Sequence, residues 1–181
     1  MLKADPEIIV DDEIVLKRFS HDIDQIKYDS IVANHDHLLP WLPWADFYHN
    51  LSDMQKFTTG QIEDFDAGRI FGYDIFYKGN FAGSIDAHEV SEQHHYCYIG
   101  YWLDKKYTGK GIMTRSASAL ADYCFDKLGM HRVTIDAAPE NEASVAVAKR
   151  LGFPFEARLK EEQCLGGKYY DTVMYTKIKV A

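Results

Sequence analysis

A glycine-containing segment, Leu103 to Met113, carries residue types that bind phosphate groups. Gly109 and Gly111 stand between a strand-like run and a helix-like run. Glycines let the backbone turn and present successive N–H groups, and a helix start adds unpaired amide donors and the positive end of the helix dipole. The segment therefore predicts an anion site suited to a pyrophosphate. Three lysines add positive charge to it: Lys105, Lys106 and Lys110.

Two common phosphate motifs do not fit this segment. The Walker pattern needs a glycine where Asp104 stands. The dinucleotide fingerprint needs a third glycine where Thr114 stands. Because two glycines alone are a weak signal, a tight turn with solvated lysines is the alternative interpretation.

Hydrophobic spacing indicates the elements that must position the loop. The stripe Met113, Ala117, Leu120, Cys124, Leu128 has helical spacing, whereas Pro40 and Pro43 prevent a continuous helix over 37–45. We expect strands at 13–19, 71–77, 81–88, 95–103, 131–137, 153–160 and 170–178, and helices at 23–31, 52–67, 111–128 and 141–151. Hairpins and two β-α-β crossovers in this order predict an α/β fold, with a mixed sheet flanked by about four helices. Gly100 inside its strand indicates a bulge or the close approach of another backbone.

Composition limits the class of protein. The chain has 181 residues and is 46% hydrophobic, which predicts one domain over 1–181 with a core that needs no disulfide or metal. The net charge of −8 argues against a nucleic-acid partner and suits cationic partners such as amines. Three scattered cysteines, no signal-like start and no long apolar window predict a cytoplasmic protein with no membrane partner.

Four segments resemble one family of enzymes. They are Ile99–Leu103, Tyr107–Thr114, Asn141–Ser144 and Leu151–Phe153. In order and spacing they are similar to the GCN5-related N-acetyltransferases, and most similar to the branch that acetylates ribosomal-protein serine and alanine N-termini. The resemblance covers about residues 10–178.

The resemblance implies acetyl-CoA as cofactor and a sheet, mostly antiparallel, that is splayed between strands 95–103 and 131–137. The pyrophosphate loop would be Lys106 to Gly111, with Lys106 where the family has Arg or Gln, and the pantetheine arm would enter the gap near Gly100. An amide of strand 95–103 would polarise the thioester carbonyl. The implied cofactor-binding residues are Tyr101, Trp102, Leu103, Lys106, Tyr107, Thr108, Gly109, Lys110, Gly111, Ile112, Asn141 and Ser144.

The same resemblance implies roles for two residues at the start of the helix expected at 141–151. Asn141 would contact the cofactor arm, although an ordinary helix N-cap is the alternative. Many members have a Tyr as general acid at the position of Ala148, and in the ribosomal-protein branch Ser144 would serve instead. The alternative for Ser144 is a first-turn serine that only satisfies backbone amides.

The general base departs from the family pattern. Gln163 stands where the branch has a Glu, and an amide cannot accept the amine proton. Glu161 ranks first as a replacement, because it shares a face with Gln163 if the chain stays extended. Glu162 would then point the other way. A solvated surface charge, or a water chain to solvent, is the alternative.

The acceptor site is expected between the first helices and the last hairpin. Trp41, Trp44, Tyr169 and Tyr170 are its candidate wall residues, with plain core packing as the alternative. The paired histidines at 35/37 and 94/95 do not complete a set of metal ligands, so no metal is expected.

These patterns predict direct transfer of an acetyl group from acetyl-CoA to a primary amine. The resemblance points to a protein N-terminus, such as that of a ribosomal protein, and to a homodimer as found in relatives. A small-molecule amine (a polyamine, amino sugar or drug) and a non-catalytic acyl-CoA-binding module are the alternatives.

Overall fold

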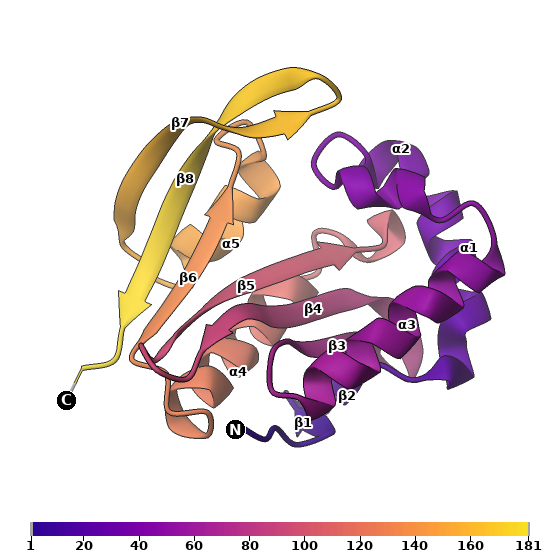
Figure 1. Ribbon diagram of the computed structural model, residues 1–181, viewed down its shortest axis with the longest axis horizontal. Helices are drawn as coiled ribbons and strands as arrows, with labels where there is room; N and C mark the ends of the chain where they lie inside the picture. The colour runs from indigo at the N-terminus through magenta and orange to yellow at the C-terminus, as the bar shows by residue number, and fades with distance from the viewer. Residues whose placement is uncertain (1, 181) are drawn as a thin grey trace.

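A single eight-stranded sheet organises the computed structural model, which describes residues 2–180 (Figure 1). Neighbouring strands are antiparallel except β5 and β6, which run parallel. The predicted mixed, mostly antiparallel sheet is thus confirmed. The strands lie in the order β1 (Glu7–Ile9), β2 (Ile14–Arg18), β3 (Phe71–Tyr77), β4 (Asn80–Ser91), β5 (Tyr96–Leu103), β6 (Arg132–Ala137), β8 (Lys168–Ile178) and β7 (Phe155–Leu165).

Helices cover both faces of the sheet (Figure 1). On one face lie α4 (Ile112–Asp126) and α5 (Glu142–Arg150), and on the other lie α1 (Asp24–Ala33), α2 (His35–Leu38) and α3 (Leu51–Asp66). The segment after α2 is irregular, as its prolines predict, and contains a 3₁₀ turn at Pro43–Phe47. Within residues 2–180, none of the helices combines the length and apolar character needed to cross a bilayer.

The sequence missed β1 and underestimated the last hairpin. Strands β7 and β8 continue to Leu165 and from Lys168, where we expected a long loop. Gly166 and Gly167 join them with φ of 57° and 79°, which is the backbone that a two-residue hairpin turn requires. The Gly-Gly pair was therefore an available signal for the longer hairpin.

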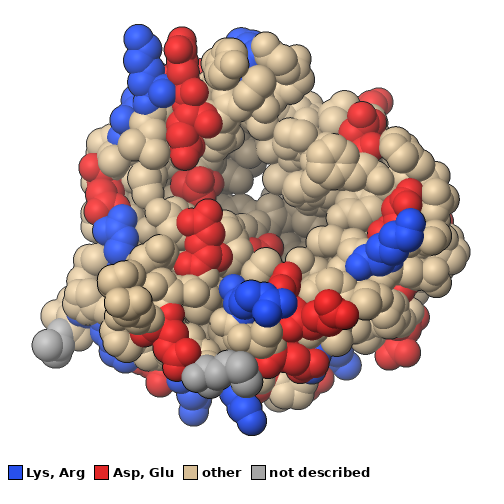
Figure 2. All heavy atoms as spheres, viewed as in Figure 1, with Lys and Arg blue, Asp and Glu red and all other residues tan. Residues whose placement is uncertain are grey.

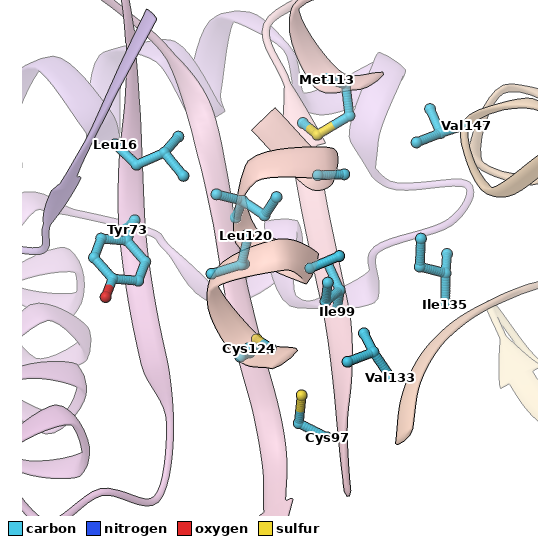
Figure 3. Close-up of a cluster of buried hydrophobic side chains, with 14 of the residues drawn as sticks. Leu16, Tyr73, Cys97, Ile99, Met113, Leu120, Cys124, Val133, Ile135 and Val147 are labelled. Carbon is cyan, nitrogen blue, oxygen red and sulfur yellow. The ribbon is translucent and has the colours of Figure 1, made fainter. Parts of the chain in front are cut away.

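The stripe of α4 forms the centre of the core. Met113, Ala117, Leu120, Cys124 and Leu128 are all buried, as their spacing predicts. Figure 3 shows Leu120 and Met113 facing side chains of β5 and β6, and the sulfurs of Cys97 and Cys124 close to one another. A hydrogen bond with Cys97 and burial both raise the pKa of the Cys124 thiol. Cys124 is thus a packed, protonated thiol rather than a nucleophile.

Strands β5 and β6 separate after a short contact. Their parallel pairing covers only Tyr96–Tyr98 against Arg132–Thr134. Beyond it, Ile99–Leu103 keeps β4 as its partner on one side, and β6 keeps β8. Figure 1 shows the two strands diverging. The predicted splay is confirmed, and it leaves backbone groups on facing edges of the gap.

A buried ion pair fixes α1 to the sheet. Lys27 Nζ lies 2.9 Å from Asp74 Oδ1, and both side chains are 1% exposed. Ser84 donates a hydrogen bond to the same carboxylate. Burial raises the pKa of Asp74 to about 6, even though Lys27 and Ser84 lower it. The charge on Asp74 therefore depends on Lys27.

Replacing Lys27 by Met is expected to destabilise the fold by about 3–5 kcal/mol, because it leaves a carboxylate buried without its cation. Urea unfolding at pH 8 measures the loss. At pH 5 the loss should be smaller, since the raised pKa of Asp74 lets it take up a proton. Adding Asp74→Asn should recover part of the stability at pH 8. A loss below about 1 kcal/mol would contradict the assignment.

Candidate active site

A cleft of about 820 Å³ runs through the gap between β5 and β6. Its middle is lined by Ile99–Leu103 and by Asp136–Ala138. One end is formed by the glycine-containing loop and the starts of α4 and α5, and the other by α2 and β7. In Figure 2 a hollow opens in the centre of the face, with mostly uncharged walls and acidic side chains along one side.

The glycine-containing loop has the geometry of a phosphate cradle. Gly109 and Gly111 have φ of 75° and 71°, and a Cβ on either would meet nothing within 4 Å. Gly111 is the N-cap of α4, and no side chain caps that helix. The first amides of α4 thus face open space that the cleft reaches, so the residues present fit a bound diphosphate.

The three predicted lysines lie outside the cleft lining. Lys106 Nζ lies 3.1 Å from Asp104, and both Lys106 and Lys110 lie over the ring of Tyr107, at 5.0 and 5.3 Å. They add positive charge near the cradle without lining it.

Two arginines that the sequence analysis missed do line the cleft. Arg115 is paired with Asp11 at 2.7 Å and Glu13 at 3.1 Å, which offsets its charge. Arg150 at the end of α5 donates a hydrogen bond to Thr114 Oγ1 on α4, and no ion pair of it occurs within residues 2–180. Only the folded arrangement of α4 beside α5 brings Arg150 to the loop.

The start of α5 places Asn141 and Ser144 on the cleft. Asn141 Oδ1 accepts a hydrogen bond from Ser144 N–H at 3.3 Å, so Asn141 is the N-cap that we kept as an alternative. Its amide NH₂ and the Ser144 hydroxyl have no partner within the described residues. Across the gap, Tyr101 donates its hydroxyl hydrogen to Ser144 O at 3.2 Å. Burial raises the pKa of Tyr101, so the hydroxyl that donates this hydrogen bond stays protonated.

Glu161 does not reach the cleft, which corrects our expectation. The ladder between β7 and β8 shifts register between Leu159 and Gln163, and Glu161 has a φ of 51°. Because this bulge breaks the alternation of faces, Gln163 lines the cleft while Glu161 is exposed. Glu162 accepts a hydrogen bond from Thr172 Oγ1 at 2.5 Å.

The four aromatic candidates lie in three different surroundings. Trp41 lines the cleft and contacts Tyr170, which does not line it, edge-to-face at 6.1 Å, so the two rings join the segment after α2 to the last hairpin. Trp44 packs against Trp102 and Tyr48, as the core alternative expects. Tyr169 is 65% exposed and lies outside the cleft lining.

The paired histidines serve different contacts. His37 lines the cleft, His35 lies 3.2 Å from Asp46, and His94 stacks on Tyr96 at 6.5 Å. Among residues 2–180, no three His, Cys, Asp or Glu side chains gather as metal ligands.

A second chamber of about 110 Å³ adjoins the cleft at Asp136, which lines both. His88 of β4 lines this chamber and is hydrogen-bonded to Asp86 at 2.6 Å. The sequence analysis missed this pair. Its signal was an Asp-x-His spacing on a strand, which puts both side chains on one face.

The phosphate cradle lies at one end of a cleft that passes between the split strands, and a second opening lies at the other end between α2 and β7. This arrangement defines an acyl-CoA-dependent transferase. Residues 13–154 match the sequence profile described as the acetyltransferase (GNAT) domain, and the chain belongs to this family of N-acetyltransferases. Its acyl donor is therefore acetyl-CoA, as predicted.

Two of the similar proteins have names that refer to ribosomal acetylation, and a third is an acetyltransferase of another kind. A putative ribosomal N-acetyltransferase, YdaF of Bacillus subtilis, is 32% identical over 82% of each chain. A structure of RimL, a ribosomal L7/L12 α-N-protein acetyltransferase in complex with coenzyme A, is 28% identical with a TM-score of 0.92, over 95% of this chain and 97% of that one. The microcin C7 self immunity acetyltransferase MccE, in complex with acetyl-CoA and AMP, is 29% identical with a TM-score of 0.93, over 97% and 98%.

Proposed function

We propose that this enzyme acetylates the α-amino group at the N-terminus of a protein, with a ribosomal protein as the favoured acceptor. The observation that carries the proposal is that two similar proteins, YdaF and RimL, are both named for ribosomal acetylation, and that the likeness to RimL spans 95% of the chain. The mouth opposite the phosphate cradle is formed by α2, the segment that follows it and β7. These are the elements that an acceptor must pass.

The acceptor mouth suits an extended chain that ends in an ammonium group. Trp41 presents an aromatic ring there, backed by the ring of Tyr170, and cations are attracted to aromatic faces. Gln163 and His37 add hydrogen-bonding groups to the wall. The rest of the peptide would extend into solvent, because the hollow is open at the surface (Figure 2).

Different residues of the cleft would serve different steps of acetyl transfer. Bound acetyl-CoA supplies a thioester, whose acyl carbon is the electrophile. The amides at Gly111 and the start of α4 would hold its diphosphate, and the free edge of β5 would orient the acyl group and polarise its carbonyl. The Ser144 hydroxyl would hydrogen-bond to the sulfur as it leaves. Holding both reactants in one cleft replaces a bimolecular encounter by a positioned one.

Free-thiol release with a panel of acceptors tests the proposal. The panel contains ribosomal-protein N-terminal peptides beginning with Ser or Ala, the same peptides with a blocked α-amine, and small amines. We expect turnover with the free peptides only, and mass spectrometry should place one acetyl group on the α-nitrogen. Turnover confined to small amines would refute the protein acceptor, and binding of CoA without any turnover would favour a non-catalytic module.

A small-molecule amine is the second candidate, because MccE is as similar to this chain as RimL and was solved with AMP beside acetyl-CoA. The panel should therefore include aminoacyl nucleotide analogues as well as polyamines. A kcat/KM at least ~10-fold higher for one of these than for any peptide would favour this candidate.

Trp41→Ala should raise the KM for the peptide about 10-fold and leave the KM for acetyl-CoA unchanged. The change removes an aromatic wall worth about 1–2 kcal/mol at a desolvated site. Phe47→Ala is the matched control, since Phe47 is a nearby aromatic that is 67% exposed and outside the cleft lining. Equal effects of the two substitutions would argue against a role for Trp41 in the acceptor site.

A further inference from the structure

The second chamber contains an acid–base pair at the point where the sheet splits. His88 and Asp86 lie on one face of β4, and their strand partners on β5 are Tyr98 and Gly100. His88 Nδ1 and Asp86 Oδ1 are 2.6 Å apart, and about one third of each side chain is exposed. The pair is thus partly shielded but accessible.

Gly100 connects this pair to the cleft. A Cβ at Gly100 would lie 3.1 Å from His88 Cε1 and 3.4 Å from Asp86 Oδ1, so these side chains occupy the space that a side chain would fill. Gly100 itself lines the cleft. The close neighbour that we expected at Gly100 is therefore a pair of side chains rather than another backbone, and no bulge occurs there.

The orientation of the imidazole determines what it can do. A carboxylate only accepts hydrogen bonds, so Asp86 requires the proton of the neutral ring to be on Nδ1. The lone pair is then on Nε2, which is free to accept a proton. This is the arrangement in which a carboxylate orients a histidine base.

We propose that His88, oriented by Asp86, accepts the proton of the acceptor amine in place of the Glu that Gln163 replaces. The proposal rests on acetyl transfer to an amine and holds for a peptide or a small amine. Nε2 takes one proton from the ammonium group, and the neutral nitrogen forms a bond to the acyl carbon as the carbon–sulfur bond breaks. The nitrogen then loses its second proton as it becomes the amide nitrogen. That second proton reaches the thiolate through the Ser144 hydroxyl or through water, and His88 returns its own proton to water.

The charges around His88 favour its protonated form once the proton has arrived. Glu89 from β4, Asp136 from β6 and Glu162 from β7 face the chamber, with the neutral Tyr98 and Thr172. Burial lowers the pKa of His88, but Asp86, Asp136 and Glu89 together raise it above its ordinary value. The same carboxylates would attract the incoming ammonium group.

Single substitutions test the base through the pH profile of kcat. His88→Gln should lower kcat at pH 7 by about 10²-fold or more and remove the rise of kcat with pH that follows deprotonation of His88. Asp86→Asn should move that rise to lower pH, because it removes a carboxylate that raises the His88 pKa. His88→Gln keeps Asp86 in place, so loss of the rise in that variant assigns it to His88 rather than to the amine.

His94→Gln is the matched control, since His94 also stacks on a tyrosine of β5 but lies away from the split. It should change neither kcat nor the pH profile. A His88→Gln enzyme with kcat within about 3-fold of wild type, or an unshifted profile in Asp86→Asn, would overturn the proposal.

A binding measurement separates this test from the identity of the acceptor. NMR of the histidine Cε1–H signals, with CoA added and no amine present, should show a shift at His88 and none at His94, because only His88 adjoins Gly100. An unmoved His88 signal on saturation with CoA would place the pair outside the reacting centre, whatever amine the enzyme accepts.

Discussion

Gly111→Val should weaken CoA binding at least ~10²-fold while the protein remains folded. Gly111 has a φ of 71°, in the left-handed region that a β-branched residue avoids. A valine there would push the backbone to negative φ and turn the first amides of α4 away from the cleft. Each hydrogen bond to a charged group is worth about 1.5–3 kcal/mol, so the loss of two accounts for the expected change.

Gly129→Val is the matched control for this substitution. Gly129 follows the other end of α4, has a φ of 69° and, like Gly111, has nothing within 4 Å of a Cβ. Both variants should lose similar free energy of unfolding, roughly 1–2 kcal/mol, but only Gly111→Val should lose affinity in calorimetry with CoA. Equal affinities in the two variants would show that the loop does not hold the diphosphate.

The cradle was predictable because it is local. A strand end, two glycines and a helix start lie within ten residues, 103–112, and each acts through its own backbone. The stripe of α4 was predictable for the same reason, since helical spacing alone decides which side chains are buried. Patterns of this kind need no knowledge of the neighbouring elements.

The catalytic surroundings were not predictable in this way. The argument for Glu161 required a regular strand, and one bulge between Leu159 and Gln163 moved that side chain out of the cleft. His88 and Asp136 come from β4 and β6, and only the sheet order makes them neighbours across the split. A sequence shows the Asp-x-His spacing but does not show that Gly100 of the adjacent strand leaves room for it.

Ser144→Ala should lower kcat about 10²-fold and leave the KM for acetyl-CoA within about 2-fold. Ser144 lines the cleft, and its hydroxyl has no partner within residues 2–180, so it is free to stabilise the departing thiolate. The backbone contacts of this residue survive the change: its N–H still donates to Asn141 and its carbonyl still accepts from Tyr101. The free energy of unfolding should therefore change by less than about 0.5 kcal/mol.

Two further variants test whether the loss of kcat is specific to the Ser144 hydroxyl. Ser144→Thr keeps a hydroxyl at the same position and should recover most of the lost kcat. Tyr101→Phe removes the tie between β5 and α5 without touching the hydroxyl, so it should lower kcat less than Ser144→Ala does. If Ser144→Ala retained kcat within about 3-fold, the serine would only complete the first turn of α5, and the thiolate would have to take its proton directly from water.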